Sequence, residues 1–206
     1  MNITTDRVRW GLLTVLTMAM VTAASWLASR SLAAPDDFRL AVLSQDSASP
    51  DFQLTDFDGR LRSLRDYRGR VAVIFFGFTR CPNACPTELF KLAQVMKTLG
   101  PASARVQVLF VTLDPERDTP QLLKSYVTAF DPRFVGLTGT PEQIDRVANS
   151  YHVMHVKESI GNDYTIGHST GTHVIDAQGR RRLIGPLDAS VEDFVHDLRQ
   201  LTRQLK

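Results

Sequence analysis

The sequence predicts an α/β domain in which a mixed β-sheet carries helices on both faces, preceded by one N-terminal transmembrane helix. The continuous apolar run at 71–78 and the largely apolar stretch at 106–113 are short and rich in branched and aromatic residues, as are strands buried on both faces. Each run is followed by apolar residues at helical spacing. Later patterns add short strands and a final helix, and this order of elements indicates a mixed, two-sided sheet.

The composition is that of one globular domain with a short extension. The chain has 206 residues, of which 43% are hydrophobic and 22% are charged, and these values exclude disordered, collagen-like and coiled-coil chains. The formal net charge is +2, and the charges that follow residue 30 cancel. A nucleic-acid binder needs a basic surplus, so we expect no nucleic-acid partner.

The N-terminal segment from Trp10 to Ser29 contains no charged residue. A helix of this length covers about 30 Å of hydrocarbon. Because Arg7 and Arg9 precede it, the positive-inside rule places residues 1–9 in the cytoplasm and the rest of the chain outside. We expect residues 10–29 to be a retained inner-membrane anchor, or an uncleaved signal, with the C-terminal domain in the periplasm. Small residues at 31–34 leave cleavage of a signal peptide as the alternative.

Residues 30–47 show no sustained periodicity and are expected to form a tether, with the folded domain at 48–206. The domain opens with an alternating segment that contains Asp58-Gly59, which predicts a β-hairpin with a type I′ turn. Further short strands are predicted at 134–137, 152–156, 172–175 and 181–184.

Four helices are predicted from spacing and capping residues. The first runs from Pro86 to Leu99 and is ended by Gly100-Pro101. The other three begin at capping signals, which are Thr119-Pro120, the capping box from Thr140 to Gln143, and Ser190.

Cys81 and Cys85 lie where a central strand joins a helix, a place where open α/β sheets put ligand sites. With Cys85 as N-cap and Pro86 as the first helical residue, the helix dipole is expected to lower the pKa of the Cys85 thiol. The spacing permits a disulfide and equally permits shared coordination of one metal ion. A plain stabilising disulfide is the third alternative, and only a third ligand can decide between them.

Among the five histidines, His168 has the pattern of a functional residue. It lies in a Gly-rich segment that is expected to be a loop between two strands, and sheet pairing can bring that loop beside the helix N-terminus. His196 is expected on the exposed face of the last helix. His152 and His155 are an odd number of residues apart and are expected on opposite faces of a strand, so they do not share a metal.

Four stretches, in this order, resemble the Sco/SenC family: FGFTRCPNACPTEL, LFVTLDPERDTP, FVGLTGTPEQI and DYTIGHS. The likeness covers about residues 48–205. It implies a thioredoxin-like fold and the role of a copper chaperone in cytochrome c oxidase assembly. It also implies one copper per domain, as Cu(I) or Cu(II), with Cys81, Cys85 and His168 as ligands.

The resemblance further implies delivery of copper to the dinuclear copper centre of cytochrome c oxidase. The copper-centre subunit of the oxidase is then the expected partner, together with a periplasmic copper donor or a thiol reductant. Two soft thiolates and one imidazole suit Cu(I). The alternative is a thiol-disulfide oxidoreductase that reduces the acceptor's cysteines through Cys81 and Cys85. A conventional enzyme is not expected.

The sequence departs from the family pattern at two positions near the predicted site. Asn83 and Gly167 stand where the family commonly has Asp. Two negative charges are therefore missing, although no ligand is lost. Asp114 and Asp118 are expected either to compensate for this loss or to serve only the turn and the helix cap beside Pro115 and Pro120.

Overall fold

The computed structural model describes residues 37–43 and 48–203, together with the isolated positions 18, 20 and 22. The chain divides into two compact units, Met1–Asp37 and Phe38–Lys206. Within the described part of the chain, no helix is both long enough and apolar enough to cross a membrane. The anchor predicted at 10–29 lies outside the described residues, apart from the three isolated positions.

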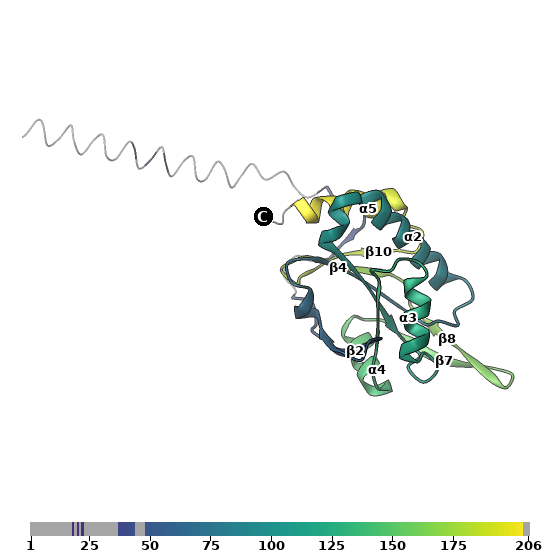
Figure 1. Ribbon diagram of the computed structural model, residues 1–206. Helices are drawn as coiled ribbons and strands as arrows, with labels where there is room; N and C mark the ends of the chain where they lie inside the picture. Colours follow the sequence, from purple (N-terminus) through teal and green to yellow (C-terminus); the bar gives the residue numbers. More distant parts are fainter. Residues whose placement is uncertain (1–17, 19, 21, 23–36, 44–47, 204–206) are drawn as a thin grey trace, which may run out of the picture. The chain divides into compact units, whose positions relative to one another are not determined.

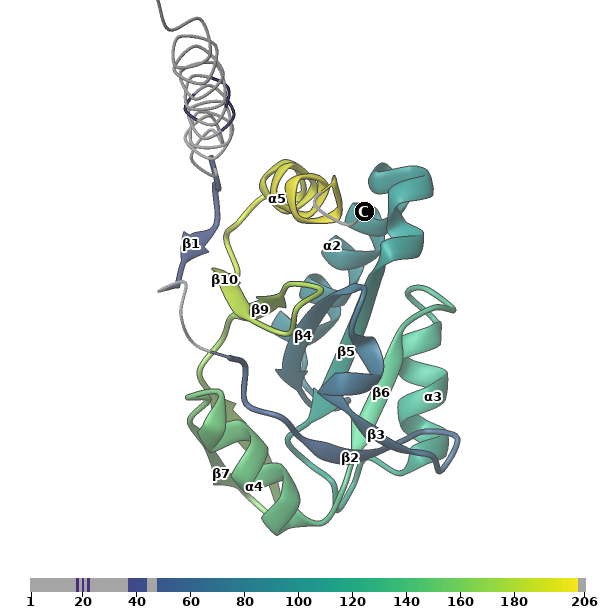
Figure 2. The same ribbon diagram turned by 90° about the vertical axis from the view of Figure 1, so that its left-hand side faces the viewer.

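The second unit is built on an eight-stranded mixed sheet (Figure 1). The strands follow the order β1-β10-β9-β4-β5-β6-β2-β3, and Figure 2 labels each of them. The central strands β4, β5 and β6 are parallel, and the other neighbours are antiparallel. The strands of this sheet are β1 Ala41–Val42, β2 Gln53–Asp56, β3 Leu61–Ser63, β4 Val71–Gly77, β5 Val106–Thr112, β6 Val135–Thr138, β9 Thr172–Ile175 and β10 Arg181–Gly185. Every residue of β4 and β5 is buried, which confirms the two predicted core strands.

The α-helices are α2 Ala84–Leu99, α3 Pro120–Thr128, α4 Pro141–Ser150 and α5 Val191–Arg203, and two short 3₁₀ helices are η1 Leu64–Tyr67 and η2 Gly100–Arg105. The caps predicted for α3, α4 and α5 are confirmed, whereas α2 begins two residues before the predicted Pro86. Thr119 Oγ1 accepts the Leu122 N–H at 3.2 Å, and Thr140 forms a capping box with Gln143. Ser190 Oγ accepts the Asp193 N–H at 3.1 Å at the start of α5.

Helices cover both faces of the sheet, as predicted. On one face, the ring of Phe75 faces Phe110, whose own ring contacts Tyr126 of α3. On the other face, Phe76 contacts Tyr151 at the end of α4. Figure 2 shows α4 and α3 on opposite sides of the strands. Phe75 and Phe76, which are adjacent in β4, therefore pack toward the helices on opposite faces of the sheet.

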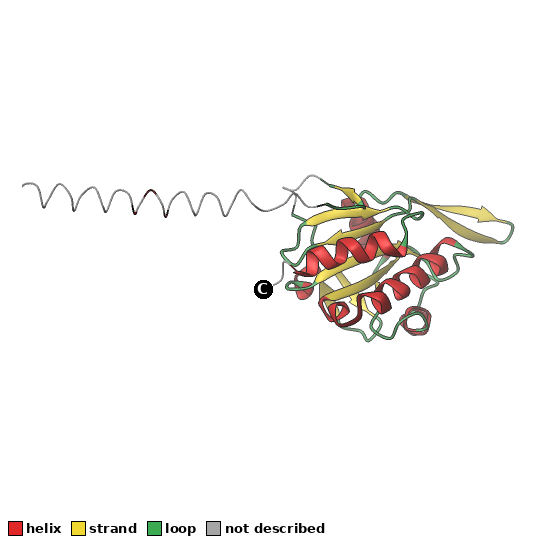
Figure 3. Cartoon of the chain, turned by 90° about the horizontal axis from the view of Figure 1, so that it is seen from above, coloured by secondary structure: helices red, strands yellow, loops and turns green. Residues whose placement is uncertain are grey.

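A separate two-stranded sheet, formed by β7 His155–Ile160 and β8 Asp163–His168, extends from the body of the domain (Figure 3). The strand predicted at 152–156 is therefore wrong in its bounds, and β8 was not predicted. Ile160 pairs with Asp163 across a two-residue turn, in which Gly161 has a φ of 58°. This sheet pairs with itself and not with the main sheet, so its residues lack the burial pattern of core strands.

The opening hairpin is confirmed, but its turn is not type I′. Four residues, 57–60, separate β2 from β3, and only Gly59 among them has a positive φ, of 80°. A type I′ turn needs positive φ at both central residues. Instead, the Asp56 carboxylate accepts the N–H groups of Asp58 and Arg60, both at 2.9 Å, and this side chain shapes the loop.

Part of the segment expected as a tether belongs to the folded domain. β1 pairs with β10, and Leu40 is buried just before it. The Asp197 carboxylate of α5 accepts the N–H of Leu40 at 2.8 Å and the N–H of Arg39 at 3.0 Å. The chain is thus fixed to the domain several residues before position 48.

Candidate metal centre

The cysteine loop joins the end of β4 to the start of α2. The Cys81 N–H donates to the carbonyl of Phe78 at 3.2 Å, which closes a turn immediately after the strand. Both cysteines are free thiols, and the Cys85 N–H donates to Cys81 Sγ at 3.4 Å. The predicted pair therefore lies together at one end of α2.

The two thiols have different surroundings from those predicted. Cys85 is not the N-cap, because Asn83 holds that position and Cys85 lies within the first turn of α2. Its side chain is fully buried, and this burial raises the pKa of the Cys85 thiol. The predicted lowering is therefore wrong. The half-exposed Cys81 is the residue whose sulfur meets an N–H at the positive end of the helix.

Gly77 makes room for the buried thiol. A Cβ at this position would lie 2.7 Å from Cys85 Sγ and 3.0 Å from the ring of Phe110. The last residue of β4 must therefore lack a side chain if the sulfur is to rest against the sheet.

Asp118, from the DPERDTP stretch, lies beside the cysteine loop. Its carboxylate accepts the N–H of Thr79 at 3.0 Å and the hydroxyl of Thr112 at 2.6 Å, and it also bonds the Thr79 hydroxyl. Burial raises the pKa of Asp118 in spite of these hydrogen bonds. One side chain thus ties the start of the cysteine loop to the end of β5.

His168 is the last residue of β8 and does not lie in a loop, which corrects the prediction. Its ring packs edge-on against Phe78, with centroids 6.2 Å apart. His168 Nδ1 lies 3.0 Å from the carbonyl oxygen of Ser169. A carbonyl only accepts, so Nδ1 carries the hydrogen and the lone pair of the neutral ring is on Nε2.

The electrostatics of His168 favour the form that binds a metal. Burial lowers the pKa of His168, and the backbone bond to Ser169 opposes this effect only in part. The ring is therefore neutral at neutral pH. A hydrogen bond from Nδ1 to a carbonyl is also the usual support for an imidazole that ligates through Nε2.

The three predicted ligands are only partly brought together. The two thiols are in contact, and His168 packs on Phe78, three residues before Cys81. Within the described residues, no group of three or more His, Cys, Asp or Glu side chains is gathered as a metal site.

The two positions that depart from the family pattern have structural roles. Asn83 Oδ1 accepts the Thr87 hydroxyl at 3.3 Å at the start of α2. At Gly167, a Cβ would collide with Oε1 of Glu158, which reaches across from β7. A carboxylate from the partner strand therefore occupies the space that a side chain at 167 would take.

Glu88 is a buried acid near the site that sequence reasoning missed. It lies three residues after Cys85 on α2, and it accepts the Thr172 hydroxyl of β9 at 2.7 Å. Its other oxygen pairs with Lys91 at 2.8 Å. Glu88 lies on the same face of α2 as the apolar residues Cys85, Leu89 and Leu92. An acid on an otherwise apolar helix face was the signal that could have identified it.

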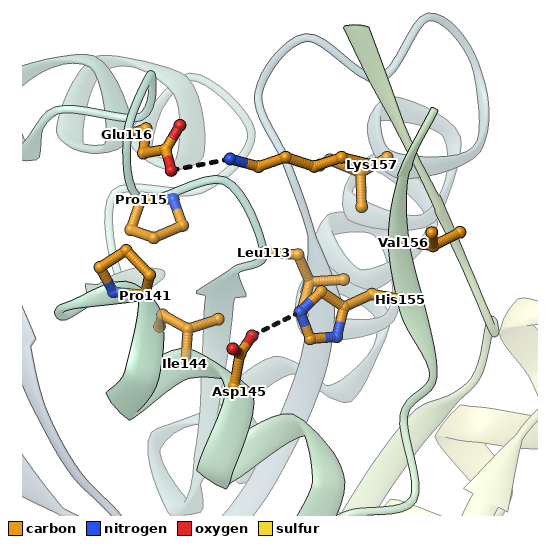
Figure 4. A pocket seen from close by; sticks show the side chains of 10 residues that line it. Leu113, Pro115, Glu116, Pro141, Ile144, Asp145, His155, Val156 and Lys157 are labelled. Atoms are coloured by element: carbon orange, nitrogen blue, oxygen red, sulfur yellow. Dashed lines mark hydrogen bonds and ion pairs between the residues drawn. The ribbon is translucent and has the colours of Figure 1, made fainter. Parts of the chain in front are cut away.

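A cavity of about 260 Å³ lies between β7, α4 and the loop that follows β5 (Figure 4). Two polar contacts cross it: a hydrogen bond between His155 and Asp145 at 2.9 Å, and an ion pair between Lys157 and Glu116 at 2.7 Å. His155 thus has a structural partner. His196, expected to be exposed, is half-buried and bonds Asp197 at 2.9 Å.

Comparison with known proteins decides the family. The SCO1/SenC family model matches residues 41–203, which is most of the chain. The chain belongs to the SCO1/SenC family. A "SCO2-like protein" of Rickettsia felis is 36% identical over 152 residues, which cover 72% of this chain and 74% of the relative.

Solved Sco structures share the fold. The structure of Bradyrhizobium japonicum ScoI with copper bound is 36% identical, with a TM-score of 0.70 over 75% of this chain and 99% of that one. The apo Sco1 protein from Thermus thermophilus is also 36% identical, with a TM-score of 0.73 over 82% of this chain and 99% of that one. These matches confirm the predicted mixed, thioredoxin-like α/β domain of a Sco/SenC protein.

Proposed function

We propose that this Sco protein binds copper through Cys81, Cys85 and His168 and delivers it to the dinuclear copper centre of cytochrome c oxidase. The supporting observation is the pair of free thiols at one strand-to-helix junction, Cys81 in the loop and Cys85 in the first turn of α2, with the His168 ring packed against Phe78 of that loop. A relative that is 36% identical has been solved with copper bound.

The donor set has the chemistry that Cu(I) prefers. Thiolates are soft ligands, and an imidazole with its lone pair on Nε2 completes a set of two sulfurs and one nitrogen. Copper binding must deprotonate Cys85, whose pKa is raised by burial, so loading releases a proton and is favoured by higher pH.

Transfer of copper to an acceptor needs ligands that the acceptor can reach. Cys81 is half-exposed and His168 is half-buried, whereas Cys85 is fully buried. Incoming thiols can therefore displace the outer ligands first, with Cys85 as the last to be released. Such stepwise exchange suits a protein that passes its copper on.

We place the domain at the periplasmic face of the inner membrane, held by residues 10–29 as a single-pass anchor. The support is the uncharged segment with Arg7 and Arg9 before it. Fractionation of cells that express the full chain tests this placement. The protein should remain with membranes after a carbonate wash and be cleaved by protease in spheroplasts; release into the periplasmic fraction would contradict retention.

The ligand set is tested by metal analysis. Protein from residue 38 onward is reduced, loaded with Cu(I) without oxygen and desalted. We expect about one copper per chain, and a clear loss in each of Cys81→Ala, Cys85→Ala and His168→Ala. His155→Ala is the matched control, since His155 pairs with His168 in the hairpin but bonds Asp145. Unchanged stoichiometry in all three ligand variants would refute the proposal.

A second candidate function is reduction of the acceptor's cysteines. The more exposed Cys81 would attack the acceptor disulfide, and Cys85 would resolve the mixed disulfide, so that two electrons and two protons pass to the acceptor. The arrangement of one half-exposed and one buried free thiol favours this alternative. His168→Ala separates the two functions, because it should abolish tight copper binding and leave the dithiol activity intact.

A further inference from the structure

Arg117, in the DPERDTP stretch, makes the central contact between the body of the domain and the β7–β8 hairpin. Its guanidinium lies 3.5 Å from the centre of the Tyr164 ring. Its Nη1 donates to the Tyr164 carbonyl and to the Asp163 carboxylate, both at 2.8 Å. Arg117 thus holds the first two residues of β8 through stacking, hydrogen bonds and charge.

Asp114 locks this arrangement from the side of the domain. Its carboxylate is fully buried, pairs with Arg117 Nε and accepts the Tyr164 hydroxyl at 2.7 Å. The same turn continues to Asp118, which holds Thr79 of the cysteine loop. One short segment, 114–118, therefore contacts both the hairpin and the cysteine loop.

The hairpin depends on such contacts because none of its strands pairs with the main sheet. His168 is the last residue of the same strand that begins at Asp163, in continuous register with β7. A displacement of the start of β8 is therefore carried along the strand to His168.

Three other pairs link the body of the domain to the hairpin, which are Glu116 with Lys157, Asp145 with His155, and Arg80 with Asp163, and each includes a carboxylate that is more than half exposed. Ion pairs with an exposed partner contribute little to the stability of the hairpin's position. The Arg117–Asp163 pair shares that exposure, so the contacts of Arg117 and the buried Asp114 with Tyr164 carry most of the clamp.

From this geometry we infer that Arg117 is a positioning residue for His168: it clamps the hairpin so that the imidazole stays against Phe78, at the start of the cysteine loop. The inference rests on the proposed function in one respect, which is that His168 is a copper ligand. The side chains of the DPERDTP and DYTIGHS stretches thus form one network in this chain.

A double-mutant cycle tests the coupling between Arg117 and His168. Cu(I) affinity is measured by competition with a chromophoric chelator for the wild type, Arg117→Ala, His168→Ala and the double variant. We expect Arg117→Ala to weaken binding about 10- to 100-fold, the range seen when groups that orient a ligand are removed. The double variant should bind no more weakly than His168→Ala alone. A further loss in the double variant would mean that Arg117 acts on the thiols, and would overturn the inference.

Arg80→Ala is the matched control. It removes an exposed arginine that contacts the same Asp163 at 3.4 Å, and its copper affinity should stay within about twofold of the wild type. Tyr164→Phe removes only the hydroxyl that bonds Asp114, keeps the ring beneath the guanidinium, and should give a smaller loss than Arg117→Ala.

A measurement without copper separates this inference from the proposed function. Hydrogen exchange of the metal-free protein should be at least tenfold faster across 155–168 in Arg117→Ala, with β4 and β5 unchanged, which also shows that the variant folds. Unchanged exchange in the hairpin would refute the clamp, whatever happens to copper. Faster exchange, combined with a His168→Ala variant of normal affinity, would uphold the clamp and refute the proposed ligand set.

Discussion

At the scale of single residues, the two thiols of one loop differ in exposure and in environment. Cys81 is half-exposed and receives an N–H from the first turn of α2, whereas Cys85 is buried against Gly77. We therefore expect Cys81 to react first with copper donors and with oxidants. Cys85 would then supply the second sulfur to the proposed copper site.

Gly77→Ala tests the space behind Cys85. The added Cβ would meet Cys85 Sγ at 2.7 Å, and overpacking of this kind costs about 1–3 kcal/mol in the free energy of unfolding. Urea unfolding measures the change. Gly136→Ala is the control, since its Cβ would lie 3.3 Å from the Leu123 side chain, a contact that small shifts relieve. Equal losses in the two variants would contradict the special role of Gly77.

His173 should make the stability of the domain depend on pH. Its ring is buried between Phe76 and Tyr151, with Arg181 and His152 nearby, and burial lowers the pKa of His173 to about 4 from 6.5. The unfolded chain therefore binds the proton more readily. Stability is complete above about pH 6.5 and falls by about 3 kcal/mol as the pH drops toward 4.

The measurement compares urea unfolding of the wild type and His173→Phe at pH 7 and pH 4.5. The variant keeps an aromatic ring between Phe76 and Tyr151 and should lose clearly less stability on acidification. The same acid sensitivity in both proteins would show that other groups are responsible.

At the scale of elements, Glu88 joins the cysteine helix to the central sheet. Its buried carboxylate holds Thr172 of β9 and pairs with Lys91. Glu88→Ala leaves the ammonium of Lys91 without this acid and should cost about 3–5 kcal/mol by urea unfolding. Glu88→Gln retains an acceptor for Thr172 and should cost less. If Glu88→Ala is as stable as the wild type, the Glu88–Lys91 pair contributes nothing to the free energy of unfolding.

The starts of helices α3, α4 and α5 could be predicted to the residue, because Thr119, Thr140 and Ser190 cap them with their own side chains. The capping side chains alone were sufficient to predict where these helices begin. The β7–β8 hairpin was missed because β7 is exposed at all but its first residue and shows no apolar alternation, while β8 is short and has a single buried residue, Ile166. The two residues Gly161 and Asn162 between the strands were the available signal, since Gly-Asn favours two-residue hairpin turns.

At the scale of the whole domain, the folded unit begins before the boundary predicted at residue 48. We compare domains that start at Phe38 and at residue 48. The shorter one loses the burial of Leu40 and leaves the buried Asp197 carboxylate without the N–H groups of Arg39 and Leu40. We expect a loss of about 3–5 kcal/mol by urea unfolding. Equal stability of the two domains would show that β1 is dispensable.

The assembly of the candidate site could be predicted only in part. Adjacency of Cys81 and Cys85 followed from their spacing at a strand-to-helix junction. The approach of His168 depends on contacts between residues far apart in sequence, above all Arg117 with Asp163 and Tyr164, which no local pattern reveals. Resemblance to a family supplied His168 as a candidate ligand. Arg117 was missed because its sequence context is that of an ordinary charged residue in a turn.

The strand order also has a consequence for biogenesis. β4 pairs with β5 through the nearby helix α2, whereas β9 and the hairpin before it come from much later in the chain. Pairings between segments close in sequence form faster than pairings between distant ones. We therefore expect Cys81 and Cys85 to come together in the nascent chain before His168 packs against Phe78. At the proposed periplasmic location, a newly exported molecule would therefore pass through an interval in which the two thiols are neighbours and the proposed third ligand, His168, is not yet in place. We expect its maturation to depend on a reductant that is present during that interval.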